Sequence, residues 1–157
     1  MRCRDGREAG FTLIEVVCVL AIVATMAAVL LPAIPRQTSR PRLEAYAVEV
    51  AALLKADRSA AVRRGLEVAT RIDAQARSIR SGTNGGAIRL PDDVRFETLL
   101  PRRCDERPAL QTISFFASGM SCGGVITLSH LDASYQIQVN WLTGRTEVVP
   151  NAGLSKR

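Results

Sequence analysis

The longest apolar stretch of the chain runs from Phe11 to Ile34 and follows a short charged segment. Its 24 residues would measure about 36 Å as an α-helix, which is enough to cross the hydrocarbon core of a membrane. Pro32 lies near the outer end of the stretch, where a kink is tolerated. The pattern predicts a transmembrane helix over residues 11–34.

One carboxylate, Glu15, interrupts this apolar stretch. A charged side chain at the centre of a membrane helix costs about 2.5–3.5 kcal/mol on insertion scales, and less near a helix end. The Glu side chain is too short to reach far toward water. We therefore expect Glu15 to have a functional role and a positively charged partner.

Apolar residues recur at helical spacing after the prolines. They are Leu43, Ala47, Val50, Leu54, Ala61 and Val62. The intervening charged residues, Asp57 among them, are assigned to the other faces, and Gly65 follows two arginines as a helix stop. The pattern predicts an amphipathic extension over residues 35–65 that packs one face on a sheet. Pro35 and Pro41 argue against one unbroken helix.

After Gly65 the period of the pattern changes to two. We expect strands over 67–73, 77–80, 87–90, 94–98, 112–117, 125–131, 135–141 and 146–149. Residues 101–108 are expected to form an exposed loop, 142–145 a hairpin turn and 151–157 a frayed tail. About seven short strands after one long helix predict an α+β fold with antiparallel sheet, in a single β domain over 66–157.

Composition is consistent with one anchored domain. The chain has 157 residues and a net charge of +6, and 19 of its 21 basic residues are arginine. A charge of this size is compatible with acidic partners but does not require nucleic acid. Arg2, Arg4 and Arg7 precede the apolar stretch and predict that the N-terminus is cytoplasmic.

The junction between the charged and apolar segments reads Gly10-Phe11-Thr12-Leu13-Ile14-Glu15. It resembles the type IV prepilin processing signal of pilins and of the pseudopilins of type II secretion. The resemblance implies a leader over residues 1–10, cleavage between Gly10 and Phe11, and N-methylation of Phe11 by a prepilin peptidase and methyltransferase. It also implies that Glu15 pairs with the Phe11 amine of a neighbouring subunit during filament assembly.

An ordinary secretory signal is the alternative interpretation of this segment. Ala27-Ala28 and Ala33 imitate a cleavage site after the apolar stretch. However, the small residue Gly10 stands before the stretch, and a secretory signal gives no reason for Glu15. The order of these residues favours the prepilin signal, and hence a single-pass bacterial inner-membrane protein with a periplasmic C-terminal domain.

The C-terminal half extends the resemblance to the GspH/FimT branch of the type IV pilin-like family. The matching stretches are Ile113-Ser114-Phe115, Gly119, Ser121, Gly123-Gly124, Ile126, Leu128, 135–139 and Thr143-Gly144-Arg145. The glycines permit positive φ between two strands, while Phe115, Ile126, Leu128, Ile137 and Val139 alternate into the core. Trp141 is expected to be a core or hairpin-packing aromatic.

Two roles compete within this branch. One is the minor pseudopilin, a structural subunit at or near the tip of the type II secretion pseudopilus. The other is a minor pilin involved in type IV pilus assembly or DNA uptake. DNA-binding members carry an Arg two positions after Gly-Arg, whereas this chain has Glu147 two positions after Arg145. A carboxylate there would repel phosphate, so the sequence favours the secretion role and argues against nucleic acid as a partner.

A second basic cluster lies between the prolines of the expected loop. Arg102, Arg103 and Arg107 alternate with Asp105 and Glu106, which is typical of a solvated loop.

The resemblance places the four cysteines in different compartments. Cys3 would leave with the leader and Cys18 lies in the apolar stretch. Cys104 and Cys122 would face the oxidising periplasm, which predicts a disulfide, with two free thiols as the alternative. Closing a loop of about eighteen residues would stabilise the domain by about 3 kcal/mol.

Catalysis finds little support in the residues. His130 is the single histidine and lies two residues before Asp132, but no nucleophile elbow accompanies them to complete a triad. We expect His130 to be a surface residue. No metal-ligand spacing or phosphate-binding loop is present, so we predict neither an enzyme nor a cofactor or metal site.

Overall fold

The computed structural model describes residues 11–30 and 38–151. The chain divides into two compact units, Met1–Arg36 and Gln37–Arg157, and each is described by itself. The predicted leader over residues 1–10, with Gly10, lies outside the described residues, as does the predicted tail beyond Asn151.

In the first unit, the described residues 11–30 contain the helix α1 over Leu13–Leu30. Thr12 caps it, because the Glu15 N–H lies 3.0 Å from the Thr12 carbonyl oxygen and 3.4 Å from Thr12 Oγ1. The predicted transmembrane helix continued to Ile34, and residues 31–34 lie outside the described part. Among the residues that are described, no helix has both the length and the apolar character needed to cross a membrane.

The second unit begins with the helix α2 over Arg40–Arg64. Ser39 precedes it in an extended conformation, and Pro41 sits in the first turn, where a missing N–H leaves no hydrogen bond unmade. Gly65 ends the helix with a left-handed φ of 65°. The stop at Gly65 is as predicted, whereas the helix begins at Arg40, inside the predicted extension over residues 35–65. Of the predicted extension, residues 35–37 lie outside the described residues.

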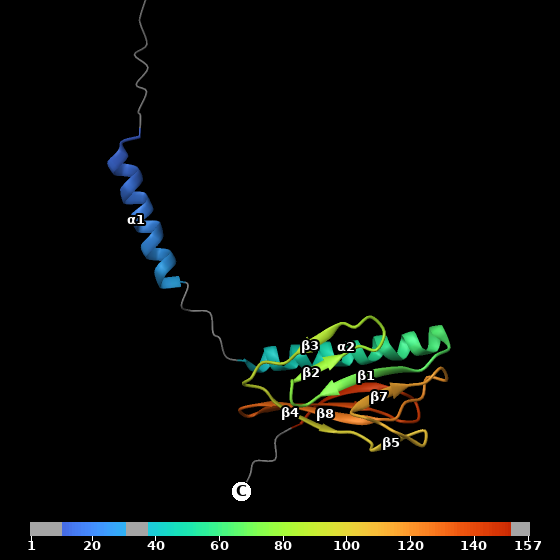
Figure 1. The fold of residues 1–157 in the computed structure, drawn as a ribbon. Helices are drawn as coiled ribbons and strands as arrows, with labels where there is room; N and C mark the ends of the chain where they lie inside the picture. Colours follow the sequence, from blue (N-terminus) through green and yellow to red (C-terminus); the bar gives the residue numbers. More distant parts are fainter. Residues whose placement is uncertain (1–10, 31–37, 152–157) are drawn as a thin grey trace, which may run out of the picture. The chain divides into compact units, whose positions relative to one another are not determined.

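Within residues 38–151, ten strands form two four-stranded antiparallel sheets and one small ribbon (Figure 1). The first sheet has the order β3-β2-β1-β7, with β1 (Val68–Asp73), β2 (Ser78–Arg80), β3 (Ala87–Arg89) and β7 (Thr112–Phe115). The second has the order β10-β9-β8-β4, with β4 (Arg95–Leu99), β8 (Gly124–His130), β9 (Ala133–Val139) and β10 (Thr146–Pro150). β5 (Arg103–Cys104) and β6 (Arg107–Pro108) make the ribbon.

The α+β class with antiparallel sheets is confirmed, but about seven strands were predicted and the described part of the chain has ten. The ribbon lies where an exposed loop was expected. Its strands are too short to show an alternating pattern. Its turn residues, Asp105 and Glu106, have φ values of 48° and 64°, which residues other than glycine seldom adopt. No conventional turn signal therefore marks the hairpin.

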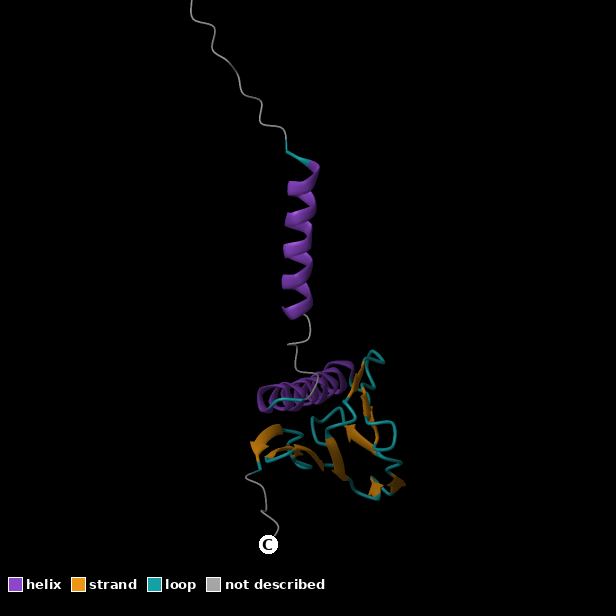
Figure 2. Ribbon diagram, turned by 90° about the vertical axis from the view of Figure 1, so that its left-hand side faces the viewer, coloured by secondary structure: helices purple, strands orange, loops and turns teal. Residues whose placement is uncertain are grey.

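One hydrophobic core lies between α2 and the two sheets, and α2 contacts β1, β7, β8, β9 and β10. Figure 2 shows the helix of this unit lying along its strands. The predicted inward positions of the strands are confirmed. They are Phe115, Ile126, Leu128, Ile137 and Val139, all buried. Five of the six predicted apolar positions of α2 are also buried: Leu43, Ala47, Val50, Leu54 and Ala61.

Two side-chain predictions for α2 were wrong, and so was one of the two options for Trp141. Val62 is exposed, because it lies one residue past Ala61 and so points away from the face that α2 buries. Trp141 is 62% exposed, which is against the core option but leaves the hairpin-packing option open. Asp57 was assigned to a polar face but is fully buried. Its burial is tolerated because buried polar groups donate hydrogen bonds to its carboxylate.

Candidate functional site

The residues of the predicted processing signal that the structure describes lie around the start of α1. Phe11 precedes the helix and its side chain is 84% exposed. Glu15 is in the first turn, also exposed, where the unpaired N–H groups of a helix favour a negative charge. In this unit the carboxylate and the aromatic ring are thus both available to a second molecule.

Asp57 binds three donors inside the second unit. Its carboxylate accepts hydrogen bonds from Thr70 Oγ1 at 2.7 Å, Ser81 Oγ at 2.6 Å and the Gly82 N–H at 3.0 Å. Thr70 belongs to β1, and Ser81 and Gly82 belong to the β2–β3 turn. Asp57 therefore fastens α2 to the first sheet. Its spacing from Val50, Leu54 and Ala61 follows the buried stripe, which is the signal that could have revealed it.

A second polar cluster holds the start of the second unit. The Asp93 carboxylate accepts hydrogen bonds from the Thr38 N–H at 2.7 Å and from Thr38 Oγ1 at 3.0 Å. The hydrogen bond from the Thr38 N–H, helped by that from its hydroxyl and by His130, holds the pKa of Asp93 below its usual value, against a smaller opposing effect of burial. The chain is thus fixed where it enters the domain.

His130 belongs to this second cluster and is not the surface residue that we expected. Its side chain is largely buried, and its Nδ1–H donates to the Asp93 carbonyl oxygen at 2.8 Å. This hydrogen bond to a backbone carbonyl oxygen fixes the orientation of the ring. It does not direct the ring at a hydroxyl nucleophile. Asp132 lies in the next turn and is exposed.

Arg58 of α2 joins the two glycine turns that carried the sequence resemblance. Its Nε–H lies 3.0 Å from the Gly119 carbonyl oxygen and 3.1 Å from the Thr143 carbonyl oxygen. A Cβ on Gly144 would overlap the Gly119 carbonyl oxygen, and Gly144 also has a φ of 62°. The turn at Thr143-Gly144-Arg145 therefore packs directly against the turn at Gly119. This close contact requires a glycine at position 144.

The structure joins Cys104 and Cys122 in a disulfide with 5.5 Å between the Cα atoms. This bond ties the β5–β6 ribbon to the turn between β7 and β8. Cys18 is a free, exposed cysteine of α1. Among residues 11–30 and 38–151, no three His, Cys, Asp or Glu side chains lie close enough together to hold a metal ion.

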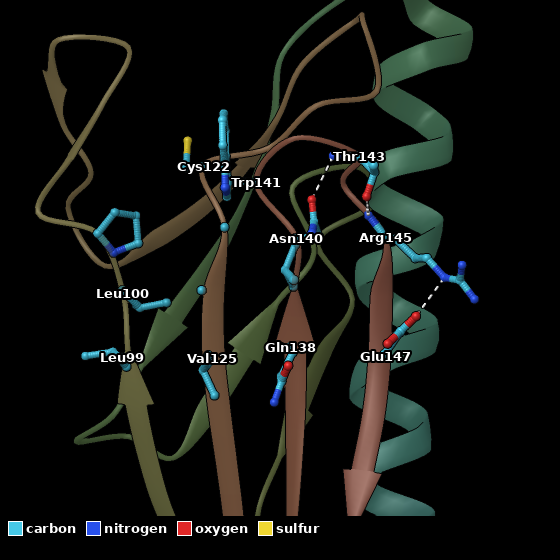
Figure 3. Close-up of a pocket in the computed structure, with 14 residues that line it drawn as sticks. Leu99, Leu100, Cys122, Val125, Gln138, Asn140, Trp141, Thr143, Arg145 and Glu147 are labelled. Atoms are coloured by element: carbon cyan, nitrogen blue, oxygen red, sulfur yellow. Dashed lines mark hydrogen bonds and ion pairs between the residues drawn. The ribbon is translucent and has the colours of Figure 1, made fainter.

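A groove of about 620 Å³ lies on the face of the second sheet that points away from the core (Figure 3). We call it the outer groove and define it by Leu99, Val125, Gln138, Trp141, Arg145 and Glu147. Strand register places Leu99, Val125, Gln138 and Glu147 in one row across β4, β8, β9 and β10. The row passes from apolar side chains at β4 to charged ones at β10.

The charged end of the outer groove is an ion pair. Arg145 Nε lies 2.8 Å from Glu147 Oε1, and both side chains are exposed (Figure 3). The residue expected to repel phosphate thus also offsets the charge of Arg145. A carboxylate therefore stands directly beside Arg145, where it would repel a nucleic-acid phosphate.

Known proteins match both the N-terminal segment and most of the whole chain. Residues 5–31 match the family described as the prokaryotic N-terminal methylation motif. The chain is 30% identical over 142 residues to the type II secretion system protein H of Xanthomonas campestris pv. campestris. That alignment covers 90% of this chain and 83% of the relative.

Solved structures show the same fold. The minor pseudopilin EpsH from the type II secretion system of Vibrio cholerae matches with a TM-score of 0.56 and 15% identity, over 74% of this chain and 99% of that one. The type IV minor pilin FimU of Pseudomonas aeruginosa matches with a TM-score of 0.53 and 18% identity, over 75% of this chain and 97% of that one.

Proposed function

The chain belongs to the family of type II secretion system protein H, and we propose that it is a minor pseudopilin, a structural subunit at or near the tip of the pseudopilus. The observation that carries this proposal is the 30% identity over 90% of the chain. In this role the subunit assists protein secretion across the outer membrane without catalysing a reaction.

Maturation follows from the N-terminal motif. Prepilin peptidase cleaves between Gly10 and Phe11, and the new amine of Phe11 is methylated; the methylation-motif match over residues 5–31 supports both steps. Residues 11–34 then hold the subunit in the inner membrane, with the domain over 66–157 and the helical extension over 35–65 in the periplasm. The Cys104–Cys122 disulfide suits that oxidising compartment.

Assembly uses Glu15. When subunits leave the lipid and their helices bundle, the Glu15 carboxylate pairs with the Phe11 amine of a neighbouring subunit. An ion pair of this kind gains strength in a low-dielectric setting, whereas a lone carboxylate there is costly. The exposed positions of Phe11 and Glu15 at the start of α1 support this pairing.

A role as a minor pilin of type IV pili is the alternative. The likeness to FimU is at the level of the fold and does not favour that role over secretion. The exposed Arg145–Glu147 pair speaks against DNA uptake through this turn.

Mass spectrometry of the chain purified from membranes of a host with the secretion system tests the proposal. We expect the loss of residues 1–10 and the gain of one methyl group, and we expect deletion of the gene to reduce secretion. A Gly10→Val variant should keep the full precursor mass and fail to restore secretion. A wild-type chain that keeps its leader, or a deletion that impairs only pili, would contradict the proposed role.

A further inference from the structure

Three arginines lie on the outward face of the first sheet. Arg71 of β1, Arg80 of β2 and Arg89 of β3 are all exposed, and each is next in the chain to a buried isoleucine of the core. Since successive side chains of a strand point to opposite faces, the three arginines point away from the core. We call the surface formed by Arg71, Arg80 and Arg89 the arginine face.

The register of the strands brings these like charges together. Arg71 lies directly opposite Arg80, and Arg89 lies diagonally across from Arg80, two residues from its partner Ala87. Side chains at directly opposite positions start about 5 Å apart, and like charges there destabilise a sheet. The three arginines therefore repel one another within the width of three strands, about 10 Å.

Neighbouring carboxylates do not neutralise the arginine face. None of the ion pairs found within residues 38–151 includes Arg71, Arg80 or Arg89. Asp73 lies on the same face, two residues from Arg71 along β1, but its Oδ1 accepts a hydrogen bond from the Ala76 N–H at 2.8 Å. The repulsion among the arginines is thus not offset within the folded domain.

The rest of the chain offers few other acids. Outside residues 38–151 the sequence contains three, Asp5, Glu8 and Glu15. The proposed maturation removes Asp5 and Glu8, and the proposed assembly engages Glu15 with an amine. A second molecule is therefore the source of negative charge that the arginine face fits.

Carboxylates of a protein fit this face better than a nucleic acid does. A guanidinium binds a carboxylate through two parallel hydrogen bonds, and a span of about 10 Å equals the separation of carboxylates two turns apart on a helix. Asp73 stands about 7 Å from Arg71 along β1, where a phosphate backbone, which is negative throughout, would be repelled. A protein surface that mixes acidic with neutral or basic side chains avoids this repulsion.

We propose that the arginine face binds an acidic surface of a different subunit of the same filament, with carboxylates of that subunit placed among Arg71, Arg80 and Arg89. The inference rests on the proposed role in a filament and names the surface that meets a neighbour and the chemistry of that neighbour. Carboxylates among the arginines replace repulsion by attraction, so the contact selects partners by their charge.

Photo-cross-linking in cells that carry the secretion system tests the contact. Ala87 is exposed and lies in one row with Arg71 and Arg80, so a photoreactive benzoylphenylalanine replaces it in the full-length chain. We expect an adduct with another subunit of the filament, linked within a segment that contains at least two acidic residues by mass spectrometry. Absence of an adduct, or a link to a segment without acidic residues, would overturn the proposal.

Arg71→Glu separates binding from folding, because the two expected effects have opposite signs. Opposite Arg80, the new carboxylate turns a repulsive cross-strand pair into an attractive one, so the Tm of the purified chain in detergent micelles should rise by about 1–5 °C. The yield of the Ala87 adduct should nevertheless fall at least about fivefold. A fall in both Tm and yield would indicate a structural role and overturn the proposal.

Arg64→Glu is the matched control, since it reverses an exposed arginine on α2, which packs against the opposite face of the sheet. The yield of the Ala87 adduct should not change in this variant. An equal loss with Arg64→Glu and Arg71→Glu would show that the contact depends on total charge and not on the arginine face.

A labelled DNA duplex, added to the same purified chain at about 50 mM salt, tests the other class of partner. We expect the wild-type chain and Arg71→Glu to behave alike. Binding by the wild-type chain that Arg71→Glu abolishes would identify nucleic acid as the ligand of this face and overturn the protein contact.

The failures of the two proposals are distinguishable. Absence of the adduct, with normal leader removal and secretion, would overturn the contact at the arginine face and leave the pseudopilin role intact. A gene deletion that impairs only pili would overturn the role in secretion, whatever adduct forms at Ala87.

Discussion

Ser81 Oγ lies 2.6 Å from Asp57 Oδ1, and this hydrogen bond connects the middle of α2 to the β2–β3 turn. The same carboxylate also accepts from Thr70 of β1 and from the Gly82 N–H. The space around Gly82 is so tight that a Cβ there would meet the Ala69 carbonyl group. A single buried acid thus decides how the first sheet approaches the helix.

Replacing Asp57 by alanine should destabilise the second unit by about 2–4 kcal/mol, because two hydroxyls and one N–H lose their acceptor in the core. Urea unfolding of the full-length chain in detergent, followed by circular dichroism, measures the loss. Glu49→Ala, an exposed acid on the same helix, should change the free energy of unfolding by less than about 0.5 kcal/mol. Equal effects of the two substitutions would refute the role of the buried network.

Gly144→Ala should destabilise the chain by more than Gly85→Ala. Both glycines have left-handed φ values, 62° and 70°, so both substitutions carry a backbone cost of about 1 kcal/mol. Only at Gly144 would the new Cβ also meet the Gly119 carbonyl oxygen and Arg58, whereas Gly85 has no atom within 4 Å. Thermal unfolding of the two variants compares them directly, and similar shifts in Tm would contradict the packing account.

Loss of the disulfide through Cys104→Ser and Cys122→Ser should lower the free energy of unfolding by about 3 kcal/mol, as expected for a sequence separation of 18 residues. A reductant should produce the same change in the wild-type chain and none in the double variant. Cys18→Ser is the control and should leave the unfolding curve unchanged. Insensitivity of the wild-type chain to reductant would show that the bond contributes nothing to stability.

Acid should weaken the attachment of Thr38 to Asp93. The folded-state pKa of this carboxyl is below its ordinary value of 3.8, so its contribution is complete above 3.8 and is lost as the pH falls through the folded value. Asp93→Asn should therefore flatten the pH dependence of stability in that range. Asp92→Asn is the matched control, since the Asp92 side chain is fully exposed. In this control variant the Tm should still fall steeply at acid pH, and more steeply than in Asp93→Asn.

Glu15→Ala should be processed normally but enter filaments poorly, because the amine of the neighbouring subunit would lose its counter-charge. Immunoblots of membrane and sheared-filament fractions, with mass spectrometry of the mature N-terminus, separate the two effects. Thr25→Ala, a polar change farther along α1, serves as the control. Normal incorporation of the Glu15→Ala subunit would rule out the pairing.

Much of the architecture could be predicted from local patterns. The buried stripe of α2, the stop at Gly65 and the inward positions of β7, β8 and β9 all follow from periodicity, because one face of each element must leave water. The β5–β6 ribbon could not be found in this way. Its strands span two residues each, and its turn uses Asp105 and Glu106 in conformations that local preference disfavours.

The N-terminal motif and the alternation of apolar residues were sufficient to indicate the family and the fold class, because both depend on residues that are neighbours in the sequence. The roles of Asp57, Arg58, Thr38 and His130 depend instead on partners 13 to 85 residues away in the chain. Only the tertiary structure brings these partners together, and only it aligns Leu99, Val125, Gln138 and Glu147 into the outer groove. Such contacts arise from how separate elements pack, and no local pattern of the chain encodes them.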